Sequence, residues 1–249
     1  MCIRDRINYG TADFHIGQSD FTYTGEDGER HVLHHCGYAN FRASLDEIKR
    51  RMPPPSKLLI AGESAGAFAV PALAADIADA WPECDDLTIC SDSAMMLMPD
   101  WPRIVREIWH APEHIASGVQ SDNILVDLYR QLADRLDGRA RYLFACGAAD
   151  SALITFQSYI DTGAFAPDQA HADGFRERLA RQVAQLQCLG VPFGFYIHDF
   201  RQADGQGQHC TLAETTFRTG LVEGVSPMDW LWAAVNGQVT RVGMGLLQR

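Results

Sequence analysis

The sequence has no apolar run approaching the roughly 18 residues that a membrane-spanning helix needs, so no transmembrane segment is expected. It also has no cluster of Lys and Arg, and its formal net charge is −11. Because nucleic acids and anionic membranes attract basic surfaces, neither is an expected partner. The oligomeric state leaves no sequence signal that we can interpret.

The seven cysteines include no Cys-x-x-Cys pair, and this spacing argues against a zinc site. The odd count defines no disulfide framework, although it leaves one or two bridges open. His110 and His114 are four residues apart, but Pro112 lies between them and breaks the helix that would pair them. We therefore expect no metal site.

The first six residues, Met-Cys-Ile-Arg-Asp-Arg, lack the apolar stretch of a signal peptide. They resemble a translated sequencing-adapter remnant, so residues 1–6 are interpreted as non-native and the chain as beginning within a longer gene. A short natural tail is the alternative.

What the sequence does contain is an alternation of short apolar runs and amphipathic stretches along 249 residues, without internal repeats. The apolar runs predict strands at residues 57–61, 87–91, 141–146 and 192–198. The amphipathic or Ala-rich stretches predict helices at residues 41–51, 65–81, 121–136, 173–189 and 227–236. Strands separated by helices indicate an α/β fold, a mostly parallel sheet with helices on both faces, in a single domain of residues 1–249.

Two segments lack a clear period, roughly residues 95–120 and residues 162–169. The first is rich in Met, Trp and Pro, and the second is short and contains Gly and Pro. Both are interpreted either as surface connections with some apolar anchoring or as a lid and pocket wall over the functional site.

Gly62-Glu63-Ser64-Ala65-Gly66 lies between a predicted strand and a predicted helix. This is the context of a nucleophile elbow, in which a strained turn projects the serine hydroxyl above the sheet. Glycines on either side of the serine are expected to remove Cβ atoms that would collide with backbone. The N–H of Ala65, at the start of the helix, is expected to serve in an oxyanion hole.

A serine nucleophile needs a base that is oriented by an acid, and in this fold the chain order is Ser, acid, His. Asp150 follows the strand at 141–146 and is the candidate acid, although an Asp there is equally typical of a helix N-cap. Asp92, one strand earlier, is the competitor and could instead brace the elbow. His198 and His209 both follow the last predicted strand, and we favour His209 because its polar, glycine-rich loop can bring the imidazole over the sheet.

These motifs together resemble the pectinacetylesterase/Notum family of serine carboxylesterases, in particular its bacterial members. Residues 9–17 are similar to the family's Tyr-Cys-Thr-Gly-Asp-x-His-x-Gly block, with Gly10 in place of the cysteine, and residues 35–40 are similar to its His-x-Gly-x-x-Asn block. Further likenesses lie at residues 62–66, 150–154, 208–212 and 228–231.

The resemblance implies a Ser64, Asp150 and His209 triad that needs no cofactor. We expect Glu63 and Trp101 to line the substrate pocket. Asp13 and His15 are expected to be structural or pocket-lining residues near the elbow and not catalytic ones. The implied substrate is an acylated carbohydrate or a small ester, and the implied location is secreted or periplasmic.

Family members carry an N-terminal portion with early strands and a second oxyanion donor, whereas this chain begins at the first shared block. We therefore interpret the chain as N-terminally truncated, without those strands, and expect it to be weak or inactive itself. Alternatives are a Notum-like deacylase of longer fatty acyl esters, a serine peptidase or acyltransferase, and a catalytically inactive binding protein.

Overall fold

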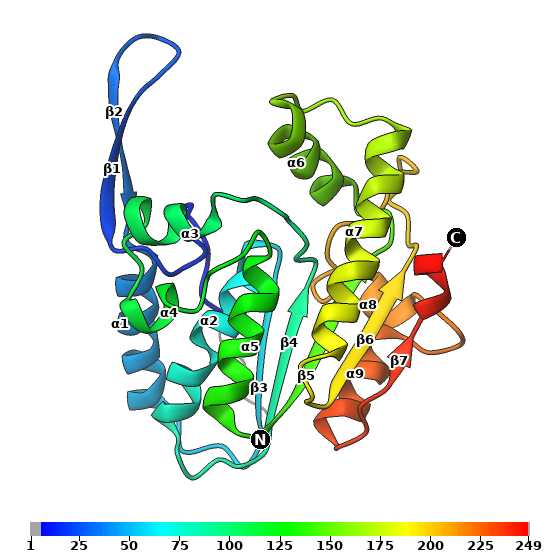
Figure 1. The fold of residues 1–249 in the computed structure, drawn as a ribbon. Coiled ribbons are helices and arrows are strands. Elements are labelled where there is room, and N and C mark those ends of the chain that lie inside the picture. The colour runs from blue at the N-terminus through cyan, green and yellow to red at the C-terminus, as the bar shows by residue number, and fades with distance from the viewer. Residues whose placement is uncertain (1–5, 249) are drawn as a thin grey trace.

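The structure is a computed structural model that describes residues 6–248, so residues 1–5 of the segment interpreted as non-native lie outside it. Its centre is a five-stranded sheet in which all neighbouring strands run parallel (Figure 1). In sheet order the strands are β3 (Leu58–Glu63), β4 (Leu87–Asp92), β5 (Ala140–Gly147), β6 (Phe193–His198) and β7 (Arg241–Val242). The first four match the predicted strands, and the predicted α/β class is confirmed.

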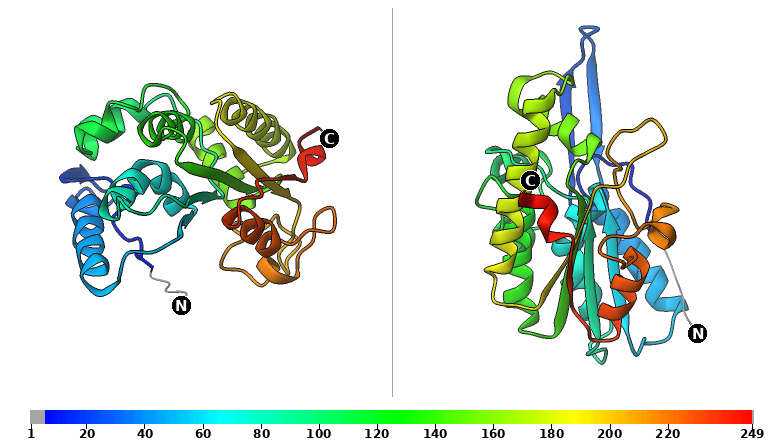
Figure 2. Two further views of the ribbon diagram at one scale, coloured as in Figure 1. Left: turned by 90° about the horizontal axis from the view of Figure 1, so that it is seen from below. Right: turned by 90° about the vertical axis from the view of Figure 1, so that its right-hand side faces the viewer.

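Helices cover both faces of this sheet, as Figure 2 shows. One face packs against α2 (Ala65–Ala80), α5 (Ile124–Leu136) and α7 (Gln169–Gln187), and the other packs against α9 (Pro227–Val235). Along β5 the side chains alternate, since Tyr142 and Phe144 join the larger core while Leu143 and Ala145 join the smaller one. All four of these residues are at most 1% exposed, which explains why β5 appears in the sequence as a continuous apolar run.

Helix α2 begins directly after Ser64 and is buried along most of its length. Its many alanines add little bulk, so the helix can pack closely on β3 and β4. Pro71 lies within it and cannot donate the N–H that would reach the carbonyl oxygen of Ala67. The hydroxyl of Ser91 donates to that oxygen instead, at 2.7 Å.

Three helices begin at residues different from those predicted, and side-chain capping explains each shift. α1 (Gly37–Arg51) begins four residues early because the distant carboxylate of Asp13 accepts the N–H of Gly37 at 2.8 Å. α7 also begins four residues early, where Asp168 forms a capping box. α5 begins three residues late, after Asn123, whose side chain accepts the N–H of Val126 at 3.2 Å.

A hairpin that the sequence analysis did not predict projects beyond the sheet, on the side of its carboxyl ends (Figure 1). It consists of β1 (Ser19–Thr24) and β2 (Arg30–His35), paired antiparallel. At its base the hydroxyl of Ser19 donates to the carbonyl of Ile108. Most of its side chains are at least partly exposed, so no apolar run marks it in the sequence.

The irregular segment after β4 contains three short helical turns, α3 (Trp101–Arg103), the π-helical η1 (Ile104–Ile108) and α4 (Glu113–Ala116). The remaining elements are α6 (Ser151–Thr162), α8 (Thr216–Thr219) and the 3-10 turn η2 (Met244–Gln248). Within residues 6–248, none of the helices combines the length and the apolar character needed to cross a membrane.

Candidate active site

Ser64 has the strained backbone expected of a nucleophile elbow. It lies between β3 and α2 with φ 53° and ψ −120°, a region that residues other than glycine rarely occupy. A Cβ on Gly62 would lie 2.2 Å from the carbonyl oxygen of Gly66, so the elbow requires glycine at position 62. The same expectation for Gly66 is wrong, because a Cβ there meets no atom within 4 Å.

The elbow is fixed to the neighbouring strand through its backbone. The N–H of Ser64 donates to the carbonyl oxygen of Asp92, the last residue of β4, at 2.9 Å. Ala65 is the first residue of α2, so its N–H has no acceptor within its own helix. Its role in an oxyanion hole stays a prediction.

Asp150 and His209 form a hydrogen-bonded pair. The Nδ1 of His209 lies 2.8 and 2.9 Å from the two carboxylate oxygens of Asp150, which is fully buried. One of those oxygens also accepts the N–H of Leu153 at 3.0 Å and so caps α6. One carboxylate therefore both contacts the histidine and caps the helix, while its role as the catalytic acid stays a prediction.

The environment of His209 favours its protonated form. Burial lowers the pKa of the imidazole, and the hydrogen bond and charge of Asp150 oppose this effect. The carboxylates of Asp92 and Glu63 act in the same direction, and the net result is a pKa above the usual value. Such a group accepts a proton readily, as a general base must.

The loop that carries His209 is bound to the carboxyl ends of the two strands beside Ser64. The N–H groups of residues 210–213 donate to side chains of Glu63, Asp92 and Ser93, over distances of 2.6 to 3.0 Å. Glu63 ends β3 and pairs in register with Asp92, which ends β4. The sheet therefore brings the histidine loop to the elbow, although the two are far apart in the sequence.

His198, the alternative base, occupies a different environment. It is fully buried at the end of β6, its Nε2 lies 2.9 Å from the hydroxyl of Thr211, and its Nδ1 accepts the N–H of Phe200 at 3.3 Å. Burial lowers its pKa to about 4, against the opposing charge of Asp150. The structure thus pairs Asp150 with His209, while His198 supports the loop.

Asp13 and His15, which we expected at the pocket, lie in a buried turn. Asp13 is fully buried and its carboxylate accepts the N–H groups of His15, at 3.0 Å, and Gly37. His15 is 8% exposed and burial lowers its pKa, opposed by the charge of Asp13. These contacts join the N-terminal segment to α1, and a pocket role for either residue stays a prediction.

Trp101 is also buried, and its indole N–H donates to the carbonyl of Met96 at 3.1 Å. Its ring belongs to an aromatic cluster around Phe14, whose ring stacks on Phe68 of α2 with centroids 4.5 Å apart. Trp109 completes the cluster. The apolar residues of the irregular segment after β4 are thus anchored in the core, and the pocket role predicted for Trp101 is untested.

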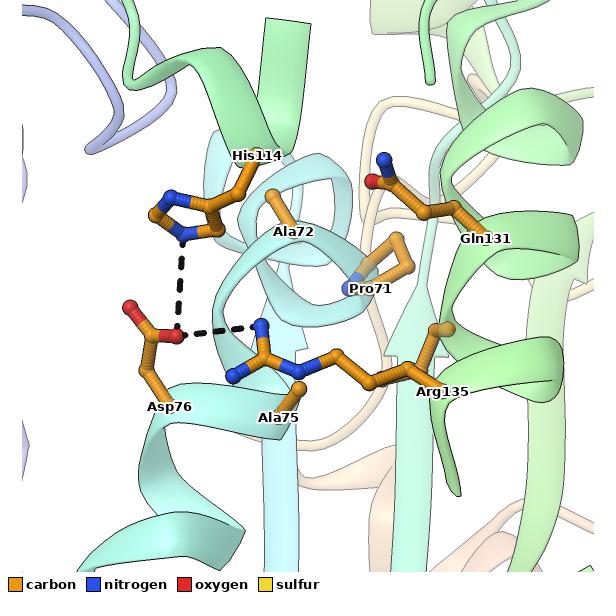
Figure 3. A pocket seen from close by; sticks show the side chains of 8 residues that line it. Pro71, Ala72, Ala75, Asp76, His114, Gln131 and Arg135 are labelled. Atoms are coloured by element: carbon orange, nitrogen blue, oxygen red, sulfur yellow. Dashed lines mark hydrogen bonds and ion pairs between the residues drawn. The ribbon is translucent and has the colours of Figure 1, made fainter. Parts of the chain in front are cut away.

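A cavity of about 300 Å³ lies between α2 and α5 (Figure 3). The carboxylate of Asp76 contacts His114 at 3.6 Å, Arg135 at 3.3 Å and the hydroxyl of Tyr38 at 2.9 Å. Asp76 lies 12 residues after Ser64, about 18 Å along the helix at 1.5 Å per residue. Since protein groups already partner this carboxylate, the network joins helices, and the cavity is separate from the elbow.

Within the described residues, no group of three or more His, Cys, Asp or Glu side chains is arranged to hold a metal ion. Six of the seven cysteines lie in this part of the chain, and each is a free thiol. Cys90 and Cys146 are fully buried in strands, where burial raises the pKa of both thiols. They pack as small apolar residues.

Sequence reasoning missed the contacts that hold the histidine loop. Ser93 was not a candidate at all, yet its hydroxyl accepts the N–H of Cys210 at 3.0 Å. Glu63 was expected to line the pocket, a role that stays a prediction, but the bond its carboxylate accepts from the N–H of Ala213 at 2.8 Å was not foreseen. The only available signal was position, since each residue directly follows or ends a parallel strand, where ligand and catalytic sites gather.

The parallel sheet, the elbow at Ser64 and an acid–histidine pair after the following strands define an α/β-hydrolase-like fold. Among solved structures, the chain is similar to the Wnt deacylase Notum from Drosophila, with a TM-score of 0.59 and 17% sequence identity. The match covers 92% of this chain and 67% of that one. At this identity the likeness shows the fold. No protein-family model matches the sequence. No curated protein matches it either.

Proposed function

We propose that this chain is a serine carboxylic-ester hydrolase in which Ser64 is the nucleophile, His209 the base and Asp150 the acid. The observation that carries the proposal is the hydrogen bond between His209 and Asp150, together with the binding of the His209 loop to the ends of β3 and β4, next to a strained Ser64. Strain at a serine between a strand and a helix has no evident structural benefit, and such outliers cluster at active sites.

In the acylation step, His209 Nε2 takes the proton of Ser64, whose Oγ bonds to the ester carbonyl carbon. The carbonyl electron pair moves to oxygen, and the N–H of Ala65 stabilises the resulting oxyanion. As the carbonyl re-forms, the bond to the alcohol oxygen breaks and that oxygen takes the proton from His209. Asp150 orients the imidazole and stabilises its cation throughout.

In the deacylation step, His209 takes a proton from a water molecule, whose oxygen attacks the acyl carbon. The bond to Ser64 breaks, Ser64 recovers its proton from His209, and the free acid leaves. Every proton and electron pair is accounted for by the three side chains and water, so the proposed chemistry uses no cofactor.

For the substrate we propose short acyl esters, in particular O-acetyl groups on a neutral or partly esterified polysaccharide. The net charge of −11 disfavours a polyanionic glycan. Trp101 and Trp109 are 3% and 6% exposed and packed around Phe14, so neither side chain is available to wrap a long acyl chain. A relationship to the pectinacetylesterase/Notum family, and with it a secreted or periplasmic location, belongs to the same proposal.

The second candidate is a deacylase of longer fatty acyl esters. The fold likeness to a protein described as a Wnt deacylase favours it. The two candidates share the triad and differ in the length of acyl group that the enzyme accepts.

The test begins with a fluorophosphonate probe on the purified chain and on Ser64→Ala, read by intact mass. We expect one adduct on the parent protein and none on the variant. Nitrophenyl esters with acyl chains of two to sixteen carbons then separate the candidates, since kcat/KM should fall with length for an acetylesterase and rise for a fatty deacylase. A folded parent protein that gives no adduct and hydrolyses no ester would overturn the proposal in favour of a binding protein.

A further inference from the structure

His209 lies in irregular backbone between β6 and α8, and such a loop cannot hold a catalytic base in place by itself. Catalytic groups must stay within about 0.5 Å of their productive geometry, and a 1 Å displacement can cost about 100-fold in rate. The question is therefore which residues fix this loop relative to Ser64.

Asp92 is bonded to both halves of the site. Its backbone carbonyl accepts the N–H of Ser64 at 2.9 Å. Its side-chain Oδ2 accepts the N–H groups of Thr211 and Leu212 at 2.6 and 2.9 Å. One residue, fully buried at the end of β4, thus connects the nucleophile's backbone with the two residues that follow closely after the histidine.

Glu63 extends the same arrangement from the adjacent strand. It immediately precedes Ser64, and its Oε1 accepts the N–H of Ala213 at 2.8 Å. Together with the Ser93 hydroxyl bonded to Cys210, four consecutive N–H groups after His209 find their acceptors on residues that end or follow β3 and β4. Fixed rows of N–H groups bind carboxylates well.

We propose that Asp92 and Glu63 are positioning residues that hold the loop of His209 against the elbow of Ser64, in addition to the triad. The proposal rests on the proposed function. Neither carboxylate contacts His209 directly in the hydrogen bonds described, so both act through the loop backbone and through the charge they place near the imidazole.

Burial of the Asp92 carboxyl supports this assignment. Burial raises its pKa to about 7, with a smaller contribution from the charge of Glu63, and the N–H groups of Leu212 and Thr211 oppose the rise. The other titratable groups that interact with Asp92 or with the loop are Cys90, Cys146, Cys210, Asp150, His198 and His209. A buried carboxyl whose surroundings disfavour its ionisation is typical of a functional site.

The test compares Asp92→Ala with Asp92→Asn. The Asn side chain keeps an acceptor oxygen for the loop, whereas Ala removes it. We expect Asp92→Ala to lower kcat about 10- to 100-fold with little change in KM, the size of effect seen when supporting groups around a site are removed. We expect Asp92→Asn to recover most of this loss.

The pH profile of kcat tests separately the effect of the Asp92 and Glu63 charges on His209. The carboxylates of Asp92 and Glu63 both raise the pKa of His209. Glu63→Gln should therefore shift the acid limb of the kcat profile to lower pH, and Asp92→Asn should do so to the extent that Asp92, with a pKa of about 7, is ionised across the limb. A residue that served only the stability of the fold would leave that limb in place.

The matched control is Asp127→Asn. Asp127 is likewise a buried carboxylate that accepts two loop N–H groups, from Gln120 and Ser121, at 2.8 and 2.7 Å. Its partners include none of the triad residues. Kinetics are expressed per active site titrated with the fluorophosphonate, so a smaller folded fraction cannot imitate a lower kcat. Asp127→Asn should keep the parent kcat.

If Asp92→Ala does not fold, Glu63→Ala tests the same proposal at the half-buried end of β3. The expected loss in kcat is smaller, about 3- to 10-fold, because Glu63 makes one contact with the loop and Asp92 makes two. A parent-like kcat in Asp92→Ala, or in Glu63→Ala where Asp92→Ala does not fold, together with a parent-like pH profile in Glu63→Gln, would overturn the positioning proposal while leaving the hydrolase intact. Absence of labelling in the parent protein itself would instead reject the proposed function.

Discussion

The hydroxyl of Ser91, on the strand beside the elbow, donates a hydrogen bond of 2.7 Å to the carbonyl oxygen of Ala67 in α2. Helix geometry would assign that oxygen to the N–H of residue 71, which is proline and has none. A strand side chain therefore completes the hydrogen bonding of the helix that begins directly after Ser64. Tyr129, whose hydroxyl lies 2.7 Å from the same Ser91 oxygen, extends the network to α5.

We predict that Ser91→Ala lowers the free energy of unfolding by about 1–3 kcal/mol, because it leaves buried polar groups without a partner. Urea denaturation measures this change in the free energy of unfolding. Pro71→Ala restores an N–H donor inside the helix, so the cost of Ser91→Ala should be smaller in that background. Equal costs in both backgrounds would contradict this account.

The two glycines of the elbow motif should respond differently to alanine. Gly62→Ala places a Cβ against the carbonyl of Gly66 and should destabilise the protein by about 1–3 kcal/mol. Gly66→Ala meets no atom within 4 Å and gains helix propensity, roughly 0.5–1 kcal/mol. Thermal unfolding of both variants separates the cases, and an equal loss at both positions would refute the distinction.

Substitutions at Asp150 should separate its two functions. Asn is also a good N-cap, so Asp150→Asn should keep the stability of α6 and lose about 10⁴-fold in kcat, because the histidine loses its charged partner. Asp150→Ala should lose both the activity and about 1 kcal/mol of stability. Steady-state kinetics and urea denaturation on the same samples give the two quantities.

Ester hydrolysis should fall as pH falls through the raised pKa of His209, since the base must be neutral to accept the serine proton. In the parent protein the acid limb of kcat/KM should therefore lie above the ordinary histidine value of about 6.5. Asp150→Asn removes the interaction that raises this pKa and should move the limb of its residual activity downwards. An unchanged limb would mean that another group controls it.

His198 should make the fold sensitive to acid. Its folded-state pKa of about 4 lies below the ordinary value, so its contribution to stability is present above pH about 6.5 and is lost as pH falls towards 4. The thermal midpoint of the parent protein should drop across this window. His198→Asn keeps a donor and an acceptor but does not titrate, and its midpoint should change less.

The parts of the fold that the sequence predicted are those that local patterns determine. The run at residues 141–146 is apolar because it is almost entirely buried on both faces, and the elbow motif joins a strand to a helix within a few residues. The run at residues 57–61 lies at the edge of the five-stranded sheet, where only Ile60 is buried and Leu59 is 41% exposed. Ser64, Asp150 and the loop of His209 each follow a strand of a parallel sheet, whose carboxyl ends share one edge, so the sequence could predict that they lie on the same side of the sheet.

What the sequence could not predict depends on contacts between distant residues. The bond from Thr211 to Asp92 joins positions 119 apart, and that from Ala213 to Glu63 joins positions 150 apart. Asp92 was considered as a brace for the elbow, which its backbone carbonyl does provide, but its side chain holds the histidine loop. The hairpin of β1 and β2 escaped notice because its exposed faces leave no apolar pattern.

The double use of Asp150 also bears on how relatives of this chain should be interpreted. Under the proposed function, a lineage that abandoned ester hydrolysis would still be under selection to keep an acidic or amide side chain at this position, because α6 needs its cap. Asp at this position is therefore weak evidence that a homologue remains an enzyme. Ser64 is the more informative position. Replacing it with glycine would relieve the strained backbone at no cost once catalysis is no longer selected.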